Sequence, residues 1–375
     1  MTTPHHTVDS RPRDVWTLPA LCRAARLGSS GALPGVVVTG LTDDSRCVEK
    51  GTCFVAVKGA RHDGHDHVEA AIAAGASAVV VDSRFVLPRS LTSAVVVRAA
   101  DTRVALARLA ASFSLVGPGA VSGFPLVGVT GTNGKTTVAW MVRAILQAAS
   151  VPTALIGTVV YDLVSECLRA PLTTPGAVVL CHYLAQARKA GARAGVLEVS
   201  SHALEQRRCD GLSLAVGVFT NLSGDHLDYH GDMEAYAAAK RRLFDLVASD
   251  GTGVINLDDP CGVQLAREVP CRVVTYAMDR DDADVAATVE RMTRLGSDIT
   301  LTLDGVRCSL RLPLIGQYNV SNALAAAAAA RALCAETDAI VAGLEGLAHV
   351  PRRMQHVAPA DGAFSAYIED RKSVV

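Results

Sequence analysis

The segment at residues 128–137, which reads GVTGTNGKTT, has the residue types of a phosphate-binding loop. It follows an apolar run at 124–129 and precedes a helical pattern at 136–149. A glycine turn between a strand and a helix aims backbone N–H groups and the positive end of the helix at one point, which suits a polyphosphate. We therefore predict that this turn binds ATP. The residues concerned are Gly131, Thr132, Asn133, Gly134, Lys135, Thr136 and Thr137.

Two side chains of this loop suit a nucleotide and its metal ion. Lys135 would neutralise the terminal phosphates, and the Thr136 hydroxyl would bind Mg²⁺. The general pattern G-x-x-x-x-G-K-[ST] is missed by one position, because Val129 stands where that pattern has its first glycine. The alternative interpretation is a glycine turn that only joins a buried strand to a helix.

The charge balance argues against nucleic acid or an anionic membrane as a partner. The chain has 36 Lys and Arg residues against 37 Asp and Glu residues, which leaves no basic excess. Its 375 residues exceed the size at which a single core keeps growing, so we expect two or three domains. Any anionic substrate must be bound by local groups.

Nothing in the sequence predicts export or membrane insertion. The first residues contain histidines, charges and prolines instead of the apolar core of a signal peptide. No window approaches the roughly 18 uninterrupted apolar residues of a membrane span. The ten cysteines are scattered without a C-x-x-C spacing, which favours reduced thiols. We expect a cytoplasmic protein.

Residues 1–117 have the pattern of a small α/β domain. Short β-rich runs occur at 36–38, 53–57 and 78–81, with a helical stretch at 67–74 between the last two.

Residues 118–349 alternate apolar strands with helical segments, which predicts a doubly wound, mostly parallel sheet. The strands are expected at 124–129, 195–199, 215–220 and 253–257. Polar residues follow these strands directly, and in an open α/β sheet ligands bind at the carboxyl ends of strands. We expect these residues to converge on one crevice: Thr130, Ser200, Asn221 and Asp258.

An antiparallel annex is expected on the same domain. Alternating residues at 299–303 and 306–312 flank Asp304-Gly305, which predicts a hairpin with a type I′ turn. The alanine-rich stretch that follows is interpreted as a packed helix at 321–333.

After Pro351 too little sequence remains for another domain. We assign 350–369 to the start of a truncated third domain. We therefore expect the chain to bind ATP and its substrate but to form little or no product. The last six residues, 370–375, reverse-translate to a sequence that resembles a sequencing adapter, and they are excluded from fold reasoning.

The loop sequence TGTNGKTT resembles the phosphate loop of the Mur ligases and their folylpolyglutamate synthetase relatives. Further motifs occur in the order found in the Mur ligases that add the third residue of the peptidoglycan stem peptide, over roughly residues 36–355. These motifs lie at 39–46, 59–64, 173–175, 198–202, 221–231 with Lys240, and 316–322. The resemblance implies an N-terminal UDP-substrate domain, a central ATP-binding domain, and a third, Rossmann-like domain that is missing here.

Four residues have a physical interpretation beside the one that the resemblance implies. Glu198 ends a buried strand, where a carboxylate needs a cation partner, so a salt bridge is one interpretation; the family implies that it binds the second Mg²⁺. His226 and His230 are four apart, as zinc ligands on a helix would be, but no third soft ligand follows at suitable spacing. The family implies that His226 alone serves the metal site and that His230 is structural or near substrate.

From its helical context alone, Lys240 is interpreted as a solvated lysine. The resemblance implies instead that the lysine at this position is carbamylated and helps to bind Mg²⁺.

Further roles come from the resemblance alone. Ser45 would contact the uridine diphosphate end, Thr173 and Thr174 the peptide and muramoyl part, and Ser200, Gln206 and Arg208 the peptide carboxylates and nearby sugar. An arginine fork suits that task. Asn319 and Asn322 would face adenine, and Arg353 would reach the phosphates.

Two other segments need comment. The histidine cluster at 62–67 is an alternative metal site, although the family uses this stretch around the UDP end of the substrate. The family's P-G-R-M-E reads P-R-R-M-Q at 351–355, so the hinge lacks its glycine and its glutamate.

The function implied is ATP-dependent amide formation through an acyl phosphate, by a monomer. The substrates would be UDP-MurNAc-L-Ala-D-Glu and an amino acid, with meso-diaminopimelate ahead of L-lysine. The alternatives are another Mur ligase, a folylpolyglutamate synthetase relative, a generic P-loop hydrolase, and a nucleotide- and UDP-sugar-binding fragment without turnover.

Overall fold

The structure is a computed structural model that describes residues 16–28, 32–59, 62–86, 94–115, 124–278, 280, 282–353, 355–357 and 366–369. Two compact units divide the chain. The first comprises Met1–Ser122, Pro175–Gln186 and Glu205–Leu212, and the second comprises Gly123–Thr174, Ala187–Leu204 and Ser213–Val375. The adapter-like residues 370–375 lie outside the described residues.

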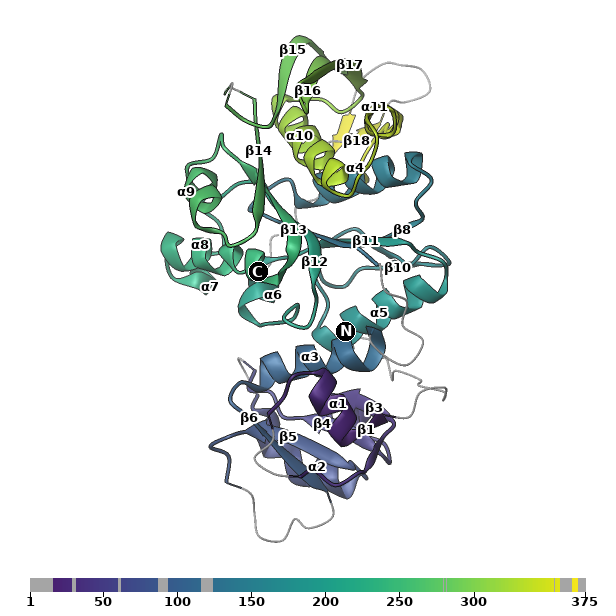
Figure 1. Cartoon of the computed structure of the whole chain (residues 1–375), viewed down its shortest axis with the longest axis vertical. Coiled ribbons are helices and arrows are strands. Elements are labelled where there is room, and N and C mark those ends of the chain that lie inside the picture. The colour runs from purple at the N-terminus through teal and green to yellow at the C-terminus, as the bar shows by residue number, and fades with distance from the viewer. Residues whose placement is uncertain are drawn as a thin grey trace. The chain divides into compact units, whose positions relative to one another are not determined.

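The first unit contains a sheet of four parallel strands in the order β3-β4-β5-β6 (Figure 1). Its strands are β3 (Gly40–Thr42), β4 (Thr52–Val55), β5 (Ala78–Asp82) and β6 (Val95–Ala99), with a separate pair β1 (Trp16–Thr17) and β2 (Val37–Val38). Its helices include α1 (Leu18–Ala24), η1 (Ser45–Cys47), η2 (Gly64–His67), α2 (Val68–Ala73) and α3 (Thr102–Leu115). Strand β4 is buried throughout, as expected for a parallel strand covered on both faces. The sequence analysis missed β6 and α3.

The second unit is built on one sheet of eleven strands. The order is β10-β9-β8-β11-β7-β12-β13-β14-β15-β16-β17. The strands from β8 to β15 in this order pair in parallel, and both edges are antiparallel. This confirms the α/β class, the mostly parallel sheet and the antiparallel annex; the parallel strands β8 and β14 and the β9–β10 edge were not anticipated. The bounds are β7 (Leu126–Thr130), β8 (Thr153–Ile156), β9 (Val160–Asp162), β10 (Cys167–Arg169), β11 (Ala194–Glu198), β12 (Leu214–Phe219), β13 (Val247–Asn256), β14 (Arg272–Ala277), β15 (Val285–Thr293), β16 (Gly296–Leu303) and β17 (Val306–Leu312).

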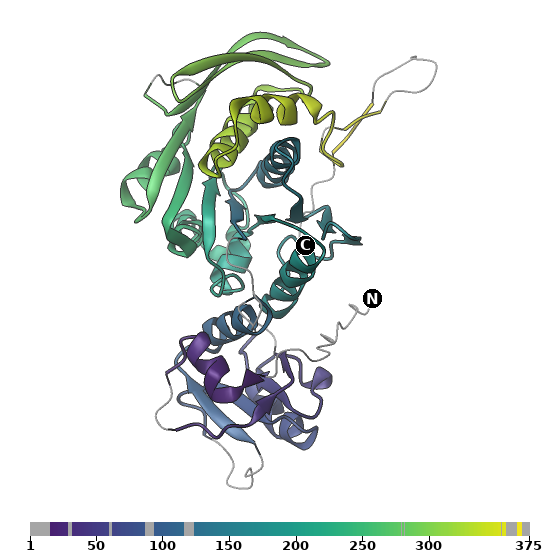
Figure 2. The ribbon, with the colours of Figure 1, turned by 45° about the vertical axis from the view of Figure 1, so that its right-hand side comes forward.

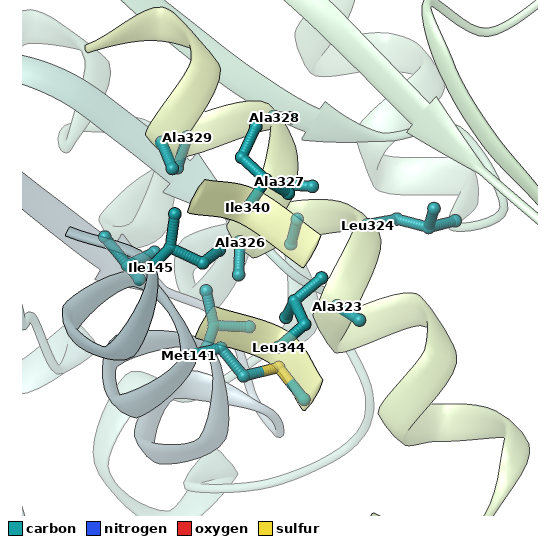
Figure 3. Close-up of a cluster of buried hydrophobic side chains, with 14 of the residues drawn as sticks. Met141, Ile145, Ala323, Leu324, Ala326, Ala327, Ala328, Ala329, Ile340 and Leu344 are labelled. Carbon is teal, nitrogen blue, oxygen red and sulfur yellow. The ribbon is translucent and has the colours of Figure 1, made fainter. Parts of the chain in front are cut away.

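Three helices share one core with this sheet. They are α4 (Lys135–Ala148), α10 (Gln317–Ala332) and α11 (Thr337–Gly346), and α10 lies between α4 and the antiparallel strands (Figure 2). Every alanine from Ala325 to Ala330 is buried, and the small side chains pack against Met141 and Ile145 of α4 (Figure 3). This confirms the packed helix, but α10 begins four residues before the expected Ser321 because it starts directly after Gly316, whose φ is 93°.

The other face of the sheet carries a smaller core. Phe219 and Ile255 pack there with Phe244 of η3 (Phe244–Leu246) and Leu265 of α9 (Pro260–Glu268). The remaining helices of the chain are α5 (Ala177–Lys189), most of which belongs to the first unit, and α6 (Ser201–Glu205), α7 (Leu227–His230) and α8 (Met233–Arg241). A short antiparallel pair, β18 (Gln355–Val357) and β19 (Ala366–Ile368), follows α11.

The hairpin prediction is confirmed. Leu303 pairs with Val306, and the two residues between them, Asp304 and Gly305, have φ of 51° and 75°. Positive φ at both central positions defines the type I′ turn. Among the described residues, no helix combines the length and the apolar character that crossing a membrane needs.

Candidate functional site

The phosphate loop is attached to the end of the neighbouring strand β12. The Thr132 N–H donates to the Asn221 carbonyl at 2.8 Å, and the Asn133 N–H donates to Asn221 Oδ1 at 3.0 Å. The Thr220 hydroxyl donates to the Asn133 carbonyl at 2.5 Å. The loop between β7 and α4 is therefore held from outside by two residues about 90 positions away in the sequence.

Two glycines of the loop are required by its shape. Gly131 has φ of 146°, and a Cβ there would lie 1.8 Å from Thr220 Oγ1. Gly134 has φ of 88°, and a Cβ there would lie 2.5 Å from Asn322 Oδ1. Other residues rarely adopt such φ values, and neither position has room for a side chain.

The start of α4 has no side-chain cap. Gly134 is the N-cap and provides no side chain to cap the helix. The first N–H groups of a helix have no partner within the helix, and they carry its positive end. Lys135 lies beside them, and its Nζ donates to the carbonyls of Gly131 at 2.8 Å and Thr132 at 3.0 Å. Desolvation lowers the pKa of Lys135, and the nearby carboxylates of Glu198 and Asp225 oppose that shift.

Glu198 ends β11 and is only 1% exposed. Its Oε2 accepts from the Thr136 hydroxyl at 2.8 Å and from the Thr158 hydroxyl at 2.9 Å, while its Oε1 accepts from the Thr158 N–H at 2.8 Å. Within the described residues the carboxylate forms no salt bridge, so the ion-pair interpretation is not observed. Hydroxyl and amide donors compensate its burial instead.

Lys240 is not a solvated lysine, and that interpretation is wrong. The residue lies on α8, is 1% exposed, and holds its Nζ 4.1 Å from the centre of the Tyr236 ring. In the described part of the chain it has no ion pair. Desolvation, with a smaller contribution from Lys135, sets the pKa of Lys240 well below the ordinary value for lysine.

The zinc-site alternative at His226 and His230 is not supported. Only His230 lies within α7; His226 is its N-cap, with φ of 54°. The His226 ring lies 5.0 Å from that of His202, and His230 Nε2 lies 2.9 Å from Ser201 Oγ. Across the ranges that the structure describes, no group of three or more His, Cys, Asp or Glu side chains could hold a metal ion.

The sequence analysis missed two residues that join these groups. The Tyr236 hydroxyl lies 3.2 Å from Thr132 Oγ1 of the phosphate loop, while its ring contacts Lys240. Burial raises the pKa of Tyr236. The second residue, Thr158, holds Glu198. Neither has a motif of its own, and only its position relative to a partner distant in the sequence shows its importance.

The predicted substrate residues divide between the two units. Thr173, Thr174 and Ser200 lie in the second unit, where the Thr174 hydroxyl donates to the Glu198 carbonyl at 2.8 Å and accepts from the Ser200 N–H at 3.0 Å. Gln206 and Arg208 lie in the first unit, where Arg208 Nη2 donates to Gln206 Oε1 at 2.7 Å. Ser45, also in the first unit, begins η1.

The predicted adenine residues contact each other and the loop. The Asn322 side chain donates from Nδ2 to Asn319 Oδ1 at 3.1 Å, and Asn319 Nδ2 donates to the Ile315 carbonyl at 2.8 Å. Both are buried, and Asn322 Oδ1 faces Gly134. The pair therefore supports the backbone of the phosphate loop.

Arg353 also reaches the loop, with Nη2 donating to Thr136 Oγ1 at 3.4 Å. Arg352, where the family pattern has glycine, has φ of 62°. The left-handed backbone that favours glycine is thus retained without the glycine.

The histidine cluster at 62–67 has a structural explanation. His65 Nδ1 lies 2.6 Å from Asp63 Oδ1, and its Nε2 accepts from the Asp82 N–H at 2.9 Å. Both ring nitrogens of this buried histidine are therefore engaged within the first unit, which leaves neither for a metal.

Comparison with known proteins gives one consistent answer. Residues 129–330 match the Mur ligase middle domain, and residues 37–114 match the Mur ligase family catalytic domain. A relative from Geobacter metallireducens, named UDP-N-acetylmuramoyl-L-alanyl-D-glutamate--2,6-diaminopimelate ligase, is 40% identical over 352 residues, which are 90% of this chain and 66% of the relative. A solved structure of a ligase of that name is 29% identical with a TM-score of 0.79, and the match covers 92% of this chain and 69% of that one.

A structure of MurF ligase from Thermotoga maritima in complex with ADP shares the fold at 22% identity, with a TM-score of 0.58 and coverage of 85% and 68%. The chain spans 66% of the length of the relative from Geobacter metallireducens and 63% and 67% of the lengths of two further relatives of the same name. From the two matched domains and these relatives, the chain belongs to the Mur ligase family.

Proposed function

We propose that this chain belongs to an ATP-dependent amide ligase that adds the third amino acid, meso-diaminopimelate, to UDP-MurNAc-L-Ala-D-Glu. The observation that carries the proposal is that the second unit brings a phosphate loop, a buried carboxylate and a buried lysine to the ends of β7, β11 and β12. The name of the relative from Geobacter metallireducens supports the choice of substrate and amino acid.

The residues present fit Mg²⁺. This ion prefers oxygen ligands and is usually held by one or two carboxylates together with phosphates and water, so it needs no cluster of protein ligands. Thr136 and Glu198 already place a hydroxyl and a carboxylate 2.8 Å apart at the phosphate loop, and we propose that His226 and Lys240 complete the site. Bound Mg²⁺ would offset the charge of the γ-phosphoryl group.

We propose that Lys240 acts as a carbamate. The nitrogen of its neutral amine would bond to the carbon of CO₂ and lose one proton to solvent, which gives an anion. Counted from the ammonium form, two protons are released and a cation is exchanged for an anion. Only the free amine has the lone pair for this step, and the lowered pKa of Lys240 favours the free amine. A carbamate would also relieve the cost of a buried ammonium group that lacks an anionic partner.

The reaction would proceed in two displacements. A carboxylate oxygen of the D-glutamate attacks the γ-phosphorus, and the bond to the β–γ bridging oxygen breaks to release ADP. The amine of the incoming amino acid then attacks the acyl carbon, phosphate leaves, and the amine proton passes to solvent. Lys135 and the N–H groups at the start of α4 would hold the phosphates through both steps. No protein nucleophile is required.

Binding and turnover test the proposal separately. Calorimetry should show that the protein binds Mg-ATP and prefers UDP-MurNAc-L-Ala-D-Glu to UDP-MurNAc-L-Ala, which lacks the reacting glutamate. Phosphate release should depend on meso-diaminopimelate more than on L-lysine. Preference for UDP-MurNAc-L-Ala, or for a folate, would assign the chain to another branch. Binding of both ligands without phosphate release would favour the alternative of a binding protein without turnover. The cytoplasmic location and the monomeric state stay predictions.

A further inference from the structure

Thr158 contacts two parts of the site that the sequence motifs treat as separate. It lies just after β8, beside the end of β11. Its N–H donates to Glu198 Oε1 at 2.8 Å, and its hydroxyl lies 2.9 Å from Glu198 Oε2. The same hydroxyl lies 3.0 Å from Thr173 Oγ1, in the T-T-P turn. One threonine thus joins the carboxylate at the phosphate loop to the proposed substrate side.

The backbone before Thr158 is shaped to admit the carboxylate. A Cβ at Gly157 would lie 2.1 Å from Glu198 Oε1, so this position must be glycine for Glu198 to occupy its place. Thr158 then engages both carboxylate oxygens and sets the orientation of the group. Because Glu198 is buried without a salt bridge in the described chain, these hydrogen bonds are part of what permits its burial.

The donor and acceptor roles of the Thr158 and Thr173 hydroxyls depend on each other. A hydroxyl has one hydrogen to donate. If the Thr158 hydroxyl donates to Glu198 Oε2, its oxygen is left to accept, and the Thr173 hydroxyl is the donor between the two threonines. A substrate oxygen that accepts from Thr173 would compete for that hydrogen. Occupation of the substrate side would therefore change the hydrogen bonding of Thr158 and, through it, of Glu198.

We propose that Thr158 is a positioning residue that orients Glu198 for the Mg-nucleotide and couples its affinity to substrate binding at Thr173. The proposal rests on the proposed function, because it takes Mg-ATP as the ligand at the phosphate loop. Thr158 lies outside every motif recognised in the sequence. It would provide a route by which the substrate at Thr173 alters the affinity for Mg-ATP. By thermodynamic linkage the coupling must be reciprocal.

The first experiment measures how Mg²⁺ changes ATP binding. Thr158→Val removes the hydroxyl but keeps the branched shape and the backbone N–H. Calorimetry with and without Mg²⁺ should show that the enhancement by Mg²⁺ falls roughly tenfold in Thr158→Val, as expected for loss of a hydrogen bond to a charged group, while Mg²⁺-free binding stays within about twofold. Thr158→Ser should restore the enhancement. Thr288→Val, on the exposed surface of β15, controls for the substitution type, and circular dichroism establishes folding.

The second experiment measures the coupling. Mg-ATP affinity is determined with and without UDP-MurNAc-L-Ala-D-Glu in the wild type, Thr158→Val, Thr173→Val and the double variant. If the two hydroxyls form one route, each single variant should lose the same coupling, and the double variant should lose no more. Additive losses would contradict the route through Thr158.

The outcomes separate the two proposals. Wild-type protein that does not bind Mg-ATP would overturn the proposed function and this inference with it. A folded Thr158→Val variant with wild-type Mg²⁺ dependence would overturn the role of Thr158 alone. Failure of Thr158→Ser to restore the dependence would likewise show that the hydroxyl is not responsible.

Discussion

Two regions of the second unit each contribute a lysine to the proposed nucleotide site, and the surroundings of the two lysines differ. Lys135 belongs to the phosphate loop, and its Nζ donates to two carbonyls of that loop, those of Gly131 and Thr132. In the segment at 225–240, Lys240 lies on a helix, buried against the Tyr236 ring, with no ion pair in the described chain. Desolvation lowers the pKa of both lysines, and Asp225 opposes the shift at both. After desolvation the largest influence on the pKa of Lys135 is Glu198, which opposes the shift, whereas at Lys240 it is Lys135, which adds to it.

The difference teaches what each lysine is suited to do. Hydrogen bonds and nearby carboxylates favour the ammonium form at Lys135, which suits the neutralisation of phosphate. A lysine that is buried without an anion favours the neutral amine, which suits covalent chemistry. The predictions that follow test this contrast.

The largest effect is expected at Lys135. Lys135→Ala should weaken Mg-ATP binding by about 100-fold or more, because the phosphates lose a charged donor at the start of α4. Isothermal titration calorimetry measures it. Lys189→Ala, an exposed lysine at the end of α5, should bind as the wild type does. Unchanged affinity in Lys135→Ala would remove the loop from the nucleotide site.

The next effect concerns the chemistry of Lys240. After incubation with ¹³C-bicarbonate, carbon NMR should show one carbamate resonance in the wild type and none in Lys240→Ala. If the protein turns over, Lys240→Ala should lose activity and regain part of it with short carboxylic acids. A carbamate signal that persists in Lys240→Ala would place the modification elsewhere.

The free energy of unfolding should depend on pH because the amine of Lys240 is buried. In CO₂-free buffer the unfolded chain holds a proton on Lys240 that the folded chain lacks, at pH values between the lowered pKa and the ordinary lysine value of about 10.4. Wild-type stability should therefore rise with pH across that window. Lys240→Met should be more stable than the wild type at neutral pH, and its advantage should shrink as the pH approaches 10. Parallel pH profiles of the two proteins in denaturant unfolding would show that folding does not lower the pKa of Lys240.

A smaller effect is expected at Gly131, in the phosphate loop that contains Lys135. Gly131→Ala should lower the free energy of unfolding by about 1–3 kcal/mol, since the new Cβ would meet Thr220 Oγ1 at 1.8 Å. Gly346→Ala is a matched control, because a Cβ there meets nothing within 4 Å. Equal stability of the two variants would mean that the loop adapts easily.

The smallest effect is expected beside the loop at Arg352. Arg352→Gly should raise the free energy of unfolding by about 0.5 kcal/mol, because relief of left-handed strain of about 1–2 kcal/mol outweighs the added entropy of glycine in the unfolded chain. Arg352→Ala keeps the strain and serves as the control. A less stable Arg352→Gly would show that Arg352 contributes contacts of its own.

The sequence by itself determined the features that depend on a few adjacent residues. The phosphate loop was found because Gly131, Gly134 and Lys135 must stand at fixed offsets between a strand and a helix. The Asp304-Gly305 turn was found for the same reason, since only certain residues accept positive φ twice in succession. Strand periodicity located β7, β11, β12 and β13 of the parallel sheet. It missed β8, β14, the β9–β10 edge and the start of α10.

Only the tertiary structure decided which side chains are buried and what they contact. In the sequence, Lys240 cannot be told from a surface lysine, because its burial depends on how α8 packs on the rest of the unit. The Tyr236 ring that it contacts lies one turn earlier on α8, and only the fold brings the Tyr236 hydroxyl to Thr132 of the phosphate loop. Thr158 has no motif, because its partners Glu198 and Thr173 lie 40 and 15 residues away. Burial and hydrogen bonding between such distant residues depend on the whole packed sheet, whereas a turn depends on the backbone angles of its own residues.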